Sequence, residues 1–339
     1  MTTEIVPFTP DHLDAAAALL AARQRSIRTE QPGLSARYTD PTETRPVVEQ
    51  ALANEVATGM VAIRDGRFIG YLIGYLIGEM VLPRPSYRPR AAWVDYAGHA
   101  VDVDDDDGGE TYRSLYAALA PRWISRGSFA HCVIVPAHDQ QALAAWHSLG
   151  FGQFHALGLR DTSPPAQRVS PPGIEIDHAG LEDAEPIVQM RRRLALHHTT
   201  SPIFEAYLPE EDAWFRTNTP ERLADPETRI LIAVRNSQPV GTFTVAPAGP
   251  RDAMAHPDRS LHIDEGFTES TERGGGVGSL LLDAALSEAR EEGYEWCSVS
   301  WRTANLQANR FWRGNGFRPV YYRLLREIDP RIAWAKPES

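Results

Sequence analysis

The sequence predicts a fold of mixed strands and helices that occurs twice in the chain. Residues 139–151 align with 305–317 without a gap, and both segments carry the same spacing of alanine, tryptophan and Gly-Phe. A proline-dense stretch, 161–172, separates the two copies and is typical of an extended linker. A length of 339 residues is enough for about two domains. We therefore predict two copies of one fold, at 1–160 and 173–339, joined by this linker.

The order of periodic segments in the C-terminal copy also indicates mixed secondary structure. Short runs of apolar residues bounded by turn residues favour strands, and longer amphipathic runs favour helices. In chain order we expect a strand at 174–176, a helix at 181–196, an irregular stretch at 197–209, a helix at 212–223, strands at 229–234 and 240–245, a proline-broken loop at 246–257, a strand at 261–268, a helix at 279–290, a strand at 296–301, a helix from 305 and a closing hairpin.

A glycine-dense turn, Arg273 to Gly278, lies between the expected strand at 261–268 and the expected helix at 279–290. The start of a helix leaves backbone N–H groups unpaired, and the helix dipole adds partial positive charge there. Glycine lets the backbone approach a phosphate closely, and Arg273 adds a full positive charge. The turn is therefore a candidate anion-binding site. Its spacing, Arg-x-x-Gly-x-Gly, differs from the nucleotide-triphosphate loop and from the dinucleotide-binding fingerprint.

A second motif follows, because 305–317 read Asn-x-x-Ala-x-x-Phe-Trp-x-x-x-Gly-Phe. The two motifs, with a helix and a strand between them, resemble the GNAT (Gcn5-related N-acetyltransferase) superfamily over about 260–327. The resemblance implies an α+β fold with a mixed, mostly antiparallel sheet flanked by helices, in two GNAT-like domains in tandem. It also implies that acetyl-coenzyme A (acetyl-CoA) is the acyl donor. Its pyrophosphate would bind the loop amides, and its pantetheine arm would bind a strand, ending near Thr268, that splays from its neighbour. The implied cofactor-binding residues are Phe267, Thr268, Arg273, Gly274, Gly275, Gly276, Val277, Gly278, Ser279, Asn305, Phe311 and Trp312.

Acetyl transfer to an amine needs a proton acceptor and a donor for the leaving thiolate. Candidate bases on the strand are Glu265, which we favour, and His262, with Asp264 beside them. Alternation puts His262 and Asp264 on one face and Glu265 on the other, unless a bulge resets the pattern. Many relatives carry a tyrosine acid where this chain has Trp312, which cannot donate a proton in that way.

Two tyrosines on the closing hairpin, Tyr321 and Tyr322, are the candidate replacements for the acid, and a protonated water is the alternative. The adjacent pair His197-His198 lacks the spacing of metal ligands, so we expect no metal site. The triple Arg191-Arg192-Arg193 either receives an anionic acceptor or is solvated.

The N-terminal copy lacks the cofactor loop. Six carboxylates occur within 102–110, where the glycine turn would stand, and they would repel a pyrophosphate. This run is either a solvated acidic turn, which we favour, or a site for a hard cation. Asp139 replaces the asparagine of the second motif. We interpret this copy as a degenerate domain that has a structural or substrate-shaping role.

Composition excludes several classes of protein. A net charge of −11 makes nucleic acid a poor partner and membrane binding unexpected. The N-terminus has no signal-peptide pattern, and the two cysteines, Cys132 and Cys297, give no disulfide framework, so we expect a cytoplasmic protein. We expect a monomer or weak dimer, with the tandem copy acting as an internal pseudo-dimer partner that helps to wall the acceptor site.

The activity that these residues indicate is acetyl transfer to a primary amine of a small molecule by direct attack in a ternary complex. Two alternatives stay open, a catalytically idle acetyl-CoA sensor and a protein N-acetyltransferase.

Overall fold

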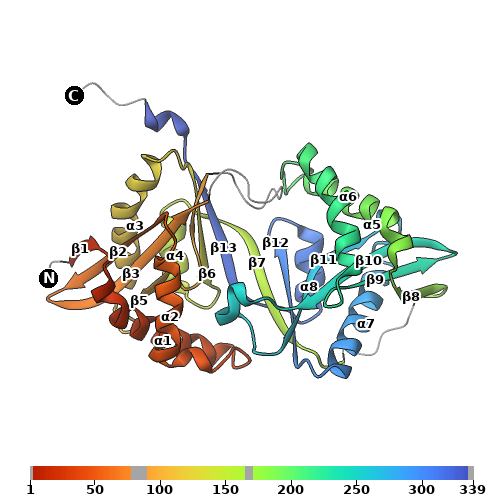
Figure 1. Ribbon diagram of the computed structural model, residues 1–339, viewed down its shortest axis with the longest axis horizontal. Coiled ribbons are helices and arrows are strands. Elements are labelled where there is room, and N and C mark those ends of the chain that lie inside the picture. Colours follow the sequence, from red (N-terminus) through yellow and green to blue (C-terminus); the bar gives the residue numbers. More distant parts are fainter. Residues whose placement is uncertain (1–2, 78–89, 165–170, 335–339) are drawn as a thin grey trace. The chain divides into compact units, whose positions relative to one another are not determined.

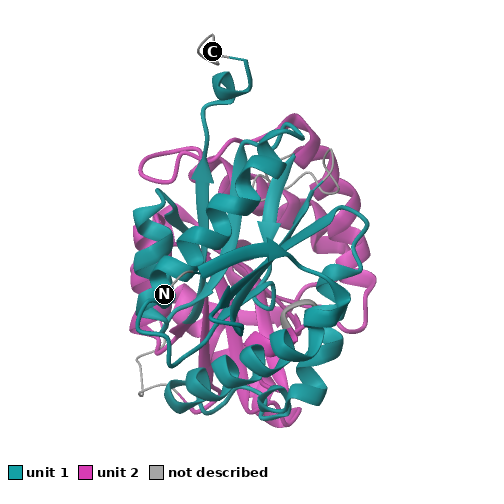
Figure 2. Ribbon diagram, turned by 90° about the vertical axis from the view of Figure 1, so that its left-hand side faces the viewer, with its two compact units in different colours: residues 1–82, 86–156, 320–339 teal, residues 83–85, 157–319 magenta. Residues whose placement is uncertain are grey.

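The computed structural model describes residues 3–77, 90–164 and 171–334. The chain divides into two compact units (Figure 2). Unit 1 comprises 1–82, 86–156 and 320–339, and unit 2 comprises 83–85 and 157–319.

Unit 1 is built on a sheet with the strand order β1-β2-β3-β4-β6-β13, in which β5 also pairs with β3. β4 and β6 are parallel, whereas β1–β2, β2–β3, β3–β4, β3–β5 and β6–β13 are antiparallel pairs. Its elements (Figure 1) are β1 (Thr3–Pro7), α1 (Leu13–Glu30), α2 (Pro41–Leu52), β2 (Ala57–Arg64), β3 (Arg67–Leu76), β4 (Ala91–Val94), β5 (His99–Val101), α3 (Gly108–Ile124), β6 (Ala130–Pro136), α4 (Gln140–Ser148) and β13 (Arg318–Glu327). Trp123 and Trp146 lie in its apolar core.

Unit 2 repeats this plan with the strand order β7-β12-β11-β10-β9-β8. β11 and β12 are parallel, and β8 through β11 are successively antiparallel. In this unit α5 and α6 cover one face of the sheet and α7 covers the other (Figure 1). Its elements are β7 (Gly152–Asp161), β8 (Ile174–His178), α5 (Ala184–His198), α6 (Pro209–Ala224), β9 (Arg229–Arg235), β10 (Gln238–Pro247), β11 (Ser260–Thr268), α7 (Val277–Glu291), β12 (Trp296–Arg302) and α8 (Leu306–Gly314). The expected α+β fold with a mostly antiparallel sheet is confirmed.

The bounds of the units differ from those expected from the repeat, because the two copies exchange a strand. β13 follows α8 of the C-terminal copy, yet it pairs with β6 of unit 1, from Tyr321 opposite Pro136 to Glu327 opposite Ala130. β7 starts in the N-terminal copy, but its part from Leu157 onwards belongs to unit 2, where it neighbours β12. The closing hairpin that we expected at the end of the C-terminal copy therefore does not form there.

Side-chain packing explains why each exchanged strand stays where it is. In unit 1, Leu324 of β13 is fully buried in the core cluster. In unit 2, a Cβ on Gly158 of β7 would lie 2.5 Å from the ring of Trp301, so only glycine lets β7 pass this tryptophan of β12. Burial of one large apolar side chain stabilises a fold by about 1.5–3 kcal/mol. Both strands are therefore integral to the unit that they complete.

Within the part of the chain that the structure describes, no helix has the length and apolar composition that crossing a membrane requires.

Candidate active site

The parallel strands β11 and β12 of unit 2 diverge partway along their length. Their pairing runs from Ser260 opposite Trp296 to Ile263 opposite Val299 and ends there, although β11 continues to Thr268 and β12 to Arg302. Beyond Ile263, the backbone N–H and C=O groups of β11 that face β12 no longer pair with that strand. The splayed strand that the sequence predicted is therefore present, and its open end can accept hydrogen bonds from a ligand or donate them to one.

The glycine turn lies at the start of α7. Gly274 and Gly276 have φ values of +80° and +91°, the left-handed conformation that side chains disfavour. Gly276 is the N-cap of α7, and no side chain caps the helix there. The first N–H groups of α7 therefore remain available to an anion. The buried face of α7, which includes Leu281 and Leu282, fixes this helix on the sheet.

A cavity of about 550 Å³ lies between the turn, β11 and α8. All the predicted cofactor residues except Gly275 line it, and so do residues that sequence reasoning missed. The full lining is Leu194, His197, Phe243, Gly266, Phe267, Thr268, Glu272, Arg273, Gly274, Gly276, Val277, Gly278, Ser279, Asn305, Gln307, Ala308, Phe311 and Trp312. A Cβ on Gly278 would lie 3.3 Å from the Phe311 ring, so the glycine at this position lets the start of α7 pack closely against Phe311.

Two polar residues of the predicted cofactor set also hold the local structure. Arg273 donates from Nε to the carbonyl oxygen of Thr268 at 3.3 Å and from Nη1 to Oε1 of Gln307 at 3.0 Å. Asn305 caps α8, since its Oδ1 accepts from the amide of Ala308 at 3.0 Å. Arg273 is exposed, so its charge is available to a ligand at the mouth of the cavity.

The same cap explains the substitution in the N-terminal copy. Asp139 accepts from the amide of Ala142 at 2.8 Å and so starts α4 as Asn305 starts α8. Asparagine and aspartate are comparable N-caps. This position of the repeat therefore preserves a helix start in both copies.

The candidate bases Glu265 and His262 lie on the same face of the sheet. Strand alternation alone predicted opposite faces for these two residues, and a bulge in β11 accounts for the difference. The register between β10 and β11 shifts, so that Thr244 is opposite Glu265 and Val245 is opposite Ile263. Asp264 is the extra residue of this bulge. Opposed residues of an antiparallel pair point to the same face. Glu265 therefore lies on the face that α5 and α6 cover, as His262 does.

Glu265 is held in an ion pair. Nε of Arg191, from α5, lies 3.1 Å from one oxygen of Glu265 and 3.0 Å from the other. Arg191 is buried, donates to the Thr219 hydroxyl at 2.8 Å, and places its guanidinium 4.6 Å from the centre of the Phe215 ring. The carboxylate thus joins β11 to α5 and α6, and neither Glu265 nor His262 belongs to the cavity lining.

The other two arginines of the triple also form ion pairs. Arg192 lies 3.3 Å from Asp212, and Arg193 lies 2.6 Å from Glu269. Arg222 of α6 pairs with Asp264 at 2.6 Å. The charges of Arg191-Arg192-Arg193 are therefore directed at carboxylates of the protein itself.

His262 lies in a small polar cluster beside the point of divergence. Its Nδ1 is 2.9 Å from Oγ of Ser298, on β12, and Ser298 donates to the carbonyl oxygen of Leu261 at 3.3 Å. The ring of His256 packs edge-on against His262 at 6.0 Å. Burial, and then the charge of His262, lower the pKa of His256 to about 3, so His256 is neutral near pH 7.

The candidate acids Tyr321 and Tyr322 are not part of this cavity. β13 carries them into unit 1, where Tyr321 is buried and packs against Tyr96 at 6.0 Å. Tyr322 packs against the core cluster of the same unit. The sequence shows that β13 is a strand but not which sheet it joins, so the sequence alone could not place these two tyrosines. No tyrosine occurs among the described residues that line the cavity.

His197 is the titratable residue that sequence reasoning missed. It ends α5, lines the cavity and has a pKa below its usual value, because of burial and then the charge of Arg273. Its neighbour His198 is more deeply buried, and burial followed by the charge of Arg302 lowers the pKa of His198 to about 3. No signal in the sequence indicates that His197 lines the cavity, because the spacing of His197 and His198 bears only on metal binding.

Unit 1 has a corresponding opening but fills it with side chains. β4 pairs with β6 from Ala91 to Val94, and β5, which follows, pairs with β3. His99 of β5 is fully buried and its Nε2 lies 2.8 Å from the carbonyl oxygen of Ile134 in β6. Because a carbonyl only accepts, Nε2 carries the proton. Arg23 of α1, also buried, donates to the carbonyl oxygens of His99 and Tyr96.

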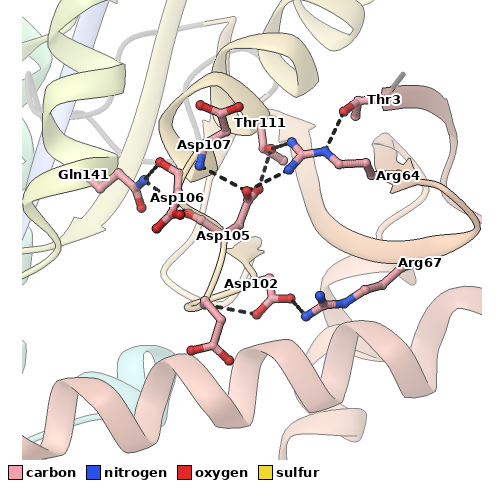
Figure 3. A network of polar contacts seen from close by, with 10 residues as sticks. Thr3, Arg64, Arg67, Asp102, Asp105, Asp106, Asp107, Thr111 and Gln141 are labelled. Carbon is pink, nitrogen blue, oxygen red and sulfur yellow. Dashed lines mark hydrogen bonds and ion pairs between the residues drawn. The ribbon is translucent and has the colours of Figure 1, made fainter. Parts of the chain in front are cut away.

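The acidic run 102–110 joins β5 to α3, as the glycine turn joins β11 to α7. Two of its carboxylates are bound by arginines of the β2–β3 hairpin, Asp102 by Arg67 and Asp105 by Arg64 (Figure 3). Asp105 also accepts from the amide of Asp107 at 3.1 Å. Burial acts to raise the pKa of Asp105, but the Arg64 hydrogen bond and others outweigh it and lower this pKa.

The acidic run is therefore a turn organised by ion pairs, rather than the fully solvated turn that we expected. Gln141 of α4 adds to it by donating to the carbonyl oxygens of Asp105 and Asp106, at 3.3 Å and 3.0 Å. Among the residues described, no three His, Cys, Asp or Glu side chains are grouped so that they could hold a metal ion.

Divergent parallel strands, an uncapped glycine-rich helix start and an aromatic-lined cavity between them form a site whose free amides suit an anionic ligand such as a pyrophosphate. Residues 194–317 match the family model described as the acetyltransferase (GNAT) family. The aminoalkylphosphonate N-acetyltransferase of Salmonella typhimurium is 26% identical over 155 residues, which cover 43% of this chain and 96% of that protein.

Two solved structures support the fold over the whole chain. A GCN5-related N-acetyltransferase from Sphaerobacter thermophilus has a TM-score of 0.58 at 16% identity, covering 97% of this chain and 96% of its own. A tandem GNAT protein from the clavulanic acid biosynthesis pathway has a TM-score of 0.50 at 17% identity, with both chains covered completely. The C-terminal copy therefore carries a GNAT-family domain, and the whole chain has the fold of tandem GNAT proteins. The family match and the Salmonella relative support an acetyl-CoA-dependent N-acetyltransferase.

Proposed function

We propose that the chain transfers the acetyl group of acetyl-CoA to the primary amine of a small molecule, by direct attack in a ternary complex. The observation that carries this proposal is the cavity at the divergence of β11 and β12, which the glycine turn borders. The Salmonella relative, named for acting on aminoalkylphosphonates, supports a small amine as the acceptor.

In this proposal the coenzyme occupies the cavity from the glycine turn inward. The first amides of α7 and Arg273 bind the pyrophosphate, because both offer positive charge to an anion. Gly266, Phe267 and Thr268, beyond the end of the β11–β12 pairing, bind the pantetheine arm through the backbone. A backbone N–H of the same strand is suited to stabilise the oxyanion formed when the amine attacks the thioester.

We assign the general base to His262 rather than to Glu265. Both oxygens of Glu265 accept from buried Arg191, which suits a residue that positions β11 against α5. His262 lies beside the last paired residues of β11 and β12, with a ring nitrogen near Ser298 that helps to fix its orientation. An imidazole can accept a proton near neutral pH, directly or through a water. With no tyrosine in the described cavity lining, we assign protonation of the leaving thiolate to water.

Release of free coenzyme A thiol from acetyl-CoA, measured against a panel of amines, tests the proposed function. The panel contains aminoalkylphosphonates, other small primary amines, a lysine peptide and a peptide with a free N-terminus. We expect small amines to raise the rate of thiol release in proportion to acetylated product. Slow hydrolysis that no amine accelerates would instead favour the acetyl-CoA sensor, and acceleration by a peptide alone would favour a protein N-acetyltransferase.

Replacement of the two candidate bases is expected to have unequal effects. His262→Gln should lower kcat by about 10²-fold, the lower range for loss of general-base catalysis, and leave the Kd for acetyl-CoA unchanged. Glu265→Gln should lower kcat less than about tenfold, because the amide keeps the shape of the side chain and its oxygen can still accept from Arg191. Steady-state kinetics and calorimetry measure both quantities. The reverse order of effects would assign the base to Glu265.

We also propose that each chain binds one acetyl-CoA, in unit 2. The support is that His99 and Arg23 occupy the opening of unit 1, and that its acidic turn replaces the glycine turn. Isothermal titration calorimetry should give one site per chain. Two equivalent sites would contradict the assignment of the N-terminal copy as a degenerate domain.

A further inference from the structure

His197 is the one histidine among the described residues that line the cofactor cavity. It ends α5 and lines the same cavity as the glycine turn and Arg273. Its ring has no hydrogen-bonding partner in the described part of the chain, and its nearest aromatic neighbour is His198, with ring centres 6.0 Å apart. A neutral imidazole beside an anion-binding turn can donate one hydrogen bond to a phosphate, and a second proton adds a full positive charge to that contact.

The charges around His197 in the free protein disfavour that second proton. Burial, and then the positive charge of Arg273, hold the pKa of His197 below its usual value. The carboxylates nearby are already paired, Glu272 with Arg235 at 3.2 Å and Glu269 with Arg193 at 2.6 Å.

His198, which follows His197 in the chain, is neutral near pH 7, because burial and then the charge of Arg302 lower its pKa to about 3. None of these groups therefore supplies a free negative charge to an imidazolium at position 197. A ligand that brings negative charge into the cavity changes that balance.

We propose that His197 takes up a proton when acetyl-CoA binds and then contacts the phosphates of the coenzyme as an imidazolium. This inference rests on the proposed placement of the coenzyme in the cavity of unit 2. The proton comes from the solvent, and no covalent bond is formed or broken. The pyrophosphate offsets the positive charge of Arg273 that opposes the proton, and it adds an attraction of its own.

The sign of the pH dependence follows from this coupling. The pKa of His197 is lower in the free protein than in the complex, so binding is tightest at pH values below the free-state pKa. Affinity then falls as the pH rises from the free-state pKa to that of the complex, by at most about tenfold per pH unit for one proton. Proton uptake is therefore largest between these two pKa values, and it disappears well above both.

Calorimetry of acetyl-CoA binding in buffers of different ionisation enthalpy, from pH 6 to pH 8.5, counts the protons taken up. For the unaltered full-length protein we expect uptake that approaches one proton near neutral pH. His197→Gln should remove this uptake and weaken binding about three- to tenfold at pH 6.5, with little change at pH 8.5. A histidine NMR titration of the free and bound protein measures the two pKa values directly.

Two controls localise the effect. His178→Gln changes a histidine on β8 that pairs with Glu288 and does not line the cavity, so uptake should persist. Acetyl-pantetheine lacks the phosphates, and its binding should take up no proton at position 197.

Three outcomes decide between the inference and the proposed function. Unchanged uptake in His197→Gln, or equal uptake with acetyl-pantetheine, would overturn the role of His197 while acetyl-CoA still binds. No binding of acetyl-CoA to the unaltered protein would instead overturn the proposed placement of the coenzyme.

Discussion

Replacing Gly276 with aspartate is expected to weaken acetyl-CoA binding by about 10³-fold. A negative charge about 4 Å from a phosphate costs about 4 kcal/mol at an effective dielectric constant of about 20, and tenfold in affinity corresponds to about 1.4 kcal/mol. The new side chain would have space, because a Cβ at this position lies 3.5 Å from its nearest neighbour, an atom of Pro171. Beyond the cost of the left-handed conformation, the expected loss is therefore electrostatic, and calorimetry measures it.

Gly276→Asn is the matched control. Asparagine has nearly the same shape as aspartate and tolerates the left-handed conformation, which costs an ordinary side chain about 1–2 kcal/mol. We expect its affinity to fall only about tenfold. Thermal unfolding of both variants should confirm that the fold is retained. Equal loss in the two variants would show that the backbone conformation, rather than the charge, governs binding at this position.

The fragment 170–339, expressed alone, is expected to give no folded protein that binds acetyl-CoA. It lacks β7, which neighbours β12 in the sheet of unit 2 and packs Gly158 against Trp301. It also retains β13 without β6, the strand with which β13 pairs from Tyr321 to Glu327. An unpaired apolar strand promotes aggregation. Circular dichroism, gel filtration and calorimetry would measure the folding and binding of the fragment.

Co-expression with 1–169 is the control for this fragment. The two pieces together contain every strand of both sheets, so we expect them to associate and to restore acetyl-CoA binding. A soluble, monomeric 170–339 that binds acetyl-CoA as tightly as the full chain would contradict the strand exchange. It would also remove the need for the N-terminal copy in forming the site.

The cavity that we propose for the cofactor could be predicted from the sequence because its determinants are local. A glycine turn before a helix creates free amides through backbone geometry alone, and the spacing from Arg273 to Gly278 carries that information. The second motif fixes α8 in the same local way, through the N-cap of Asn305 and the aromatic pair Phe311-Trp312. All the cofactor residues predicted from these segments except Gly275 line one cavity.

The sequence by itself determined the resemblance to the GNAT family, the repeated fold and the position of the glycine turn, because motif spacing and internal similarity can be read from the order of the residues alone. Only the tertiary structure decided which sheet receives β13, and thereby placed Tyr321 and Tyr322 in unit 1. It also decided the bulge at Asp264 that puts Glu265 on the face of His262, and the position of His197 beside Arg273. These features depend on packing between side chains that are far apart in the sequence. Such packing leaves no periodic signal in the sequence.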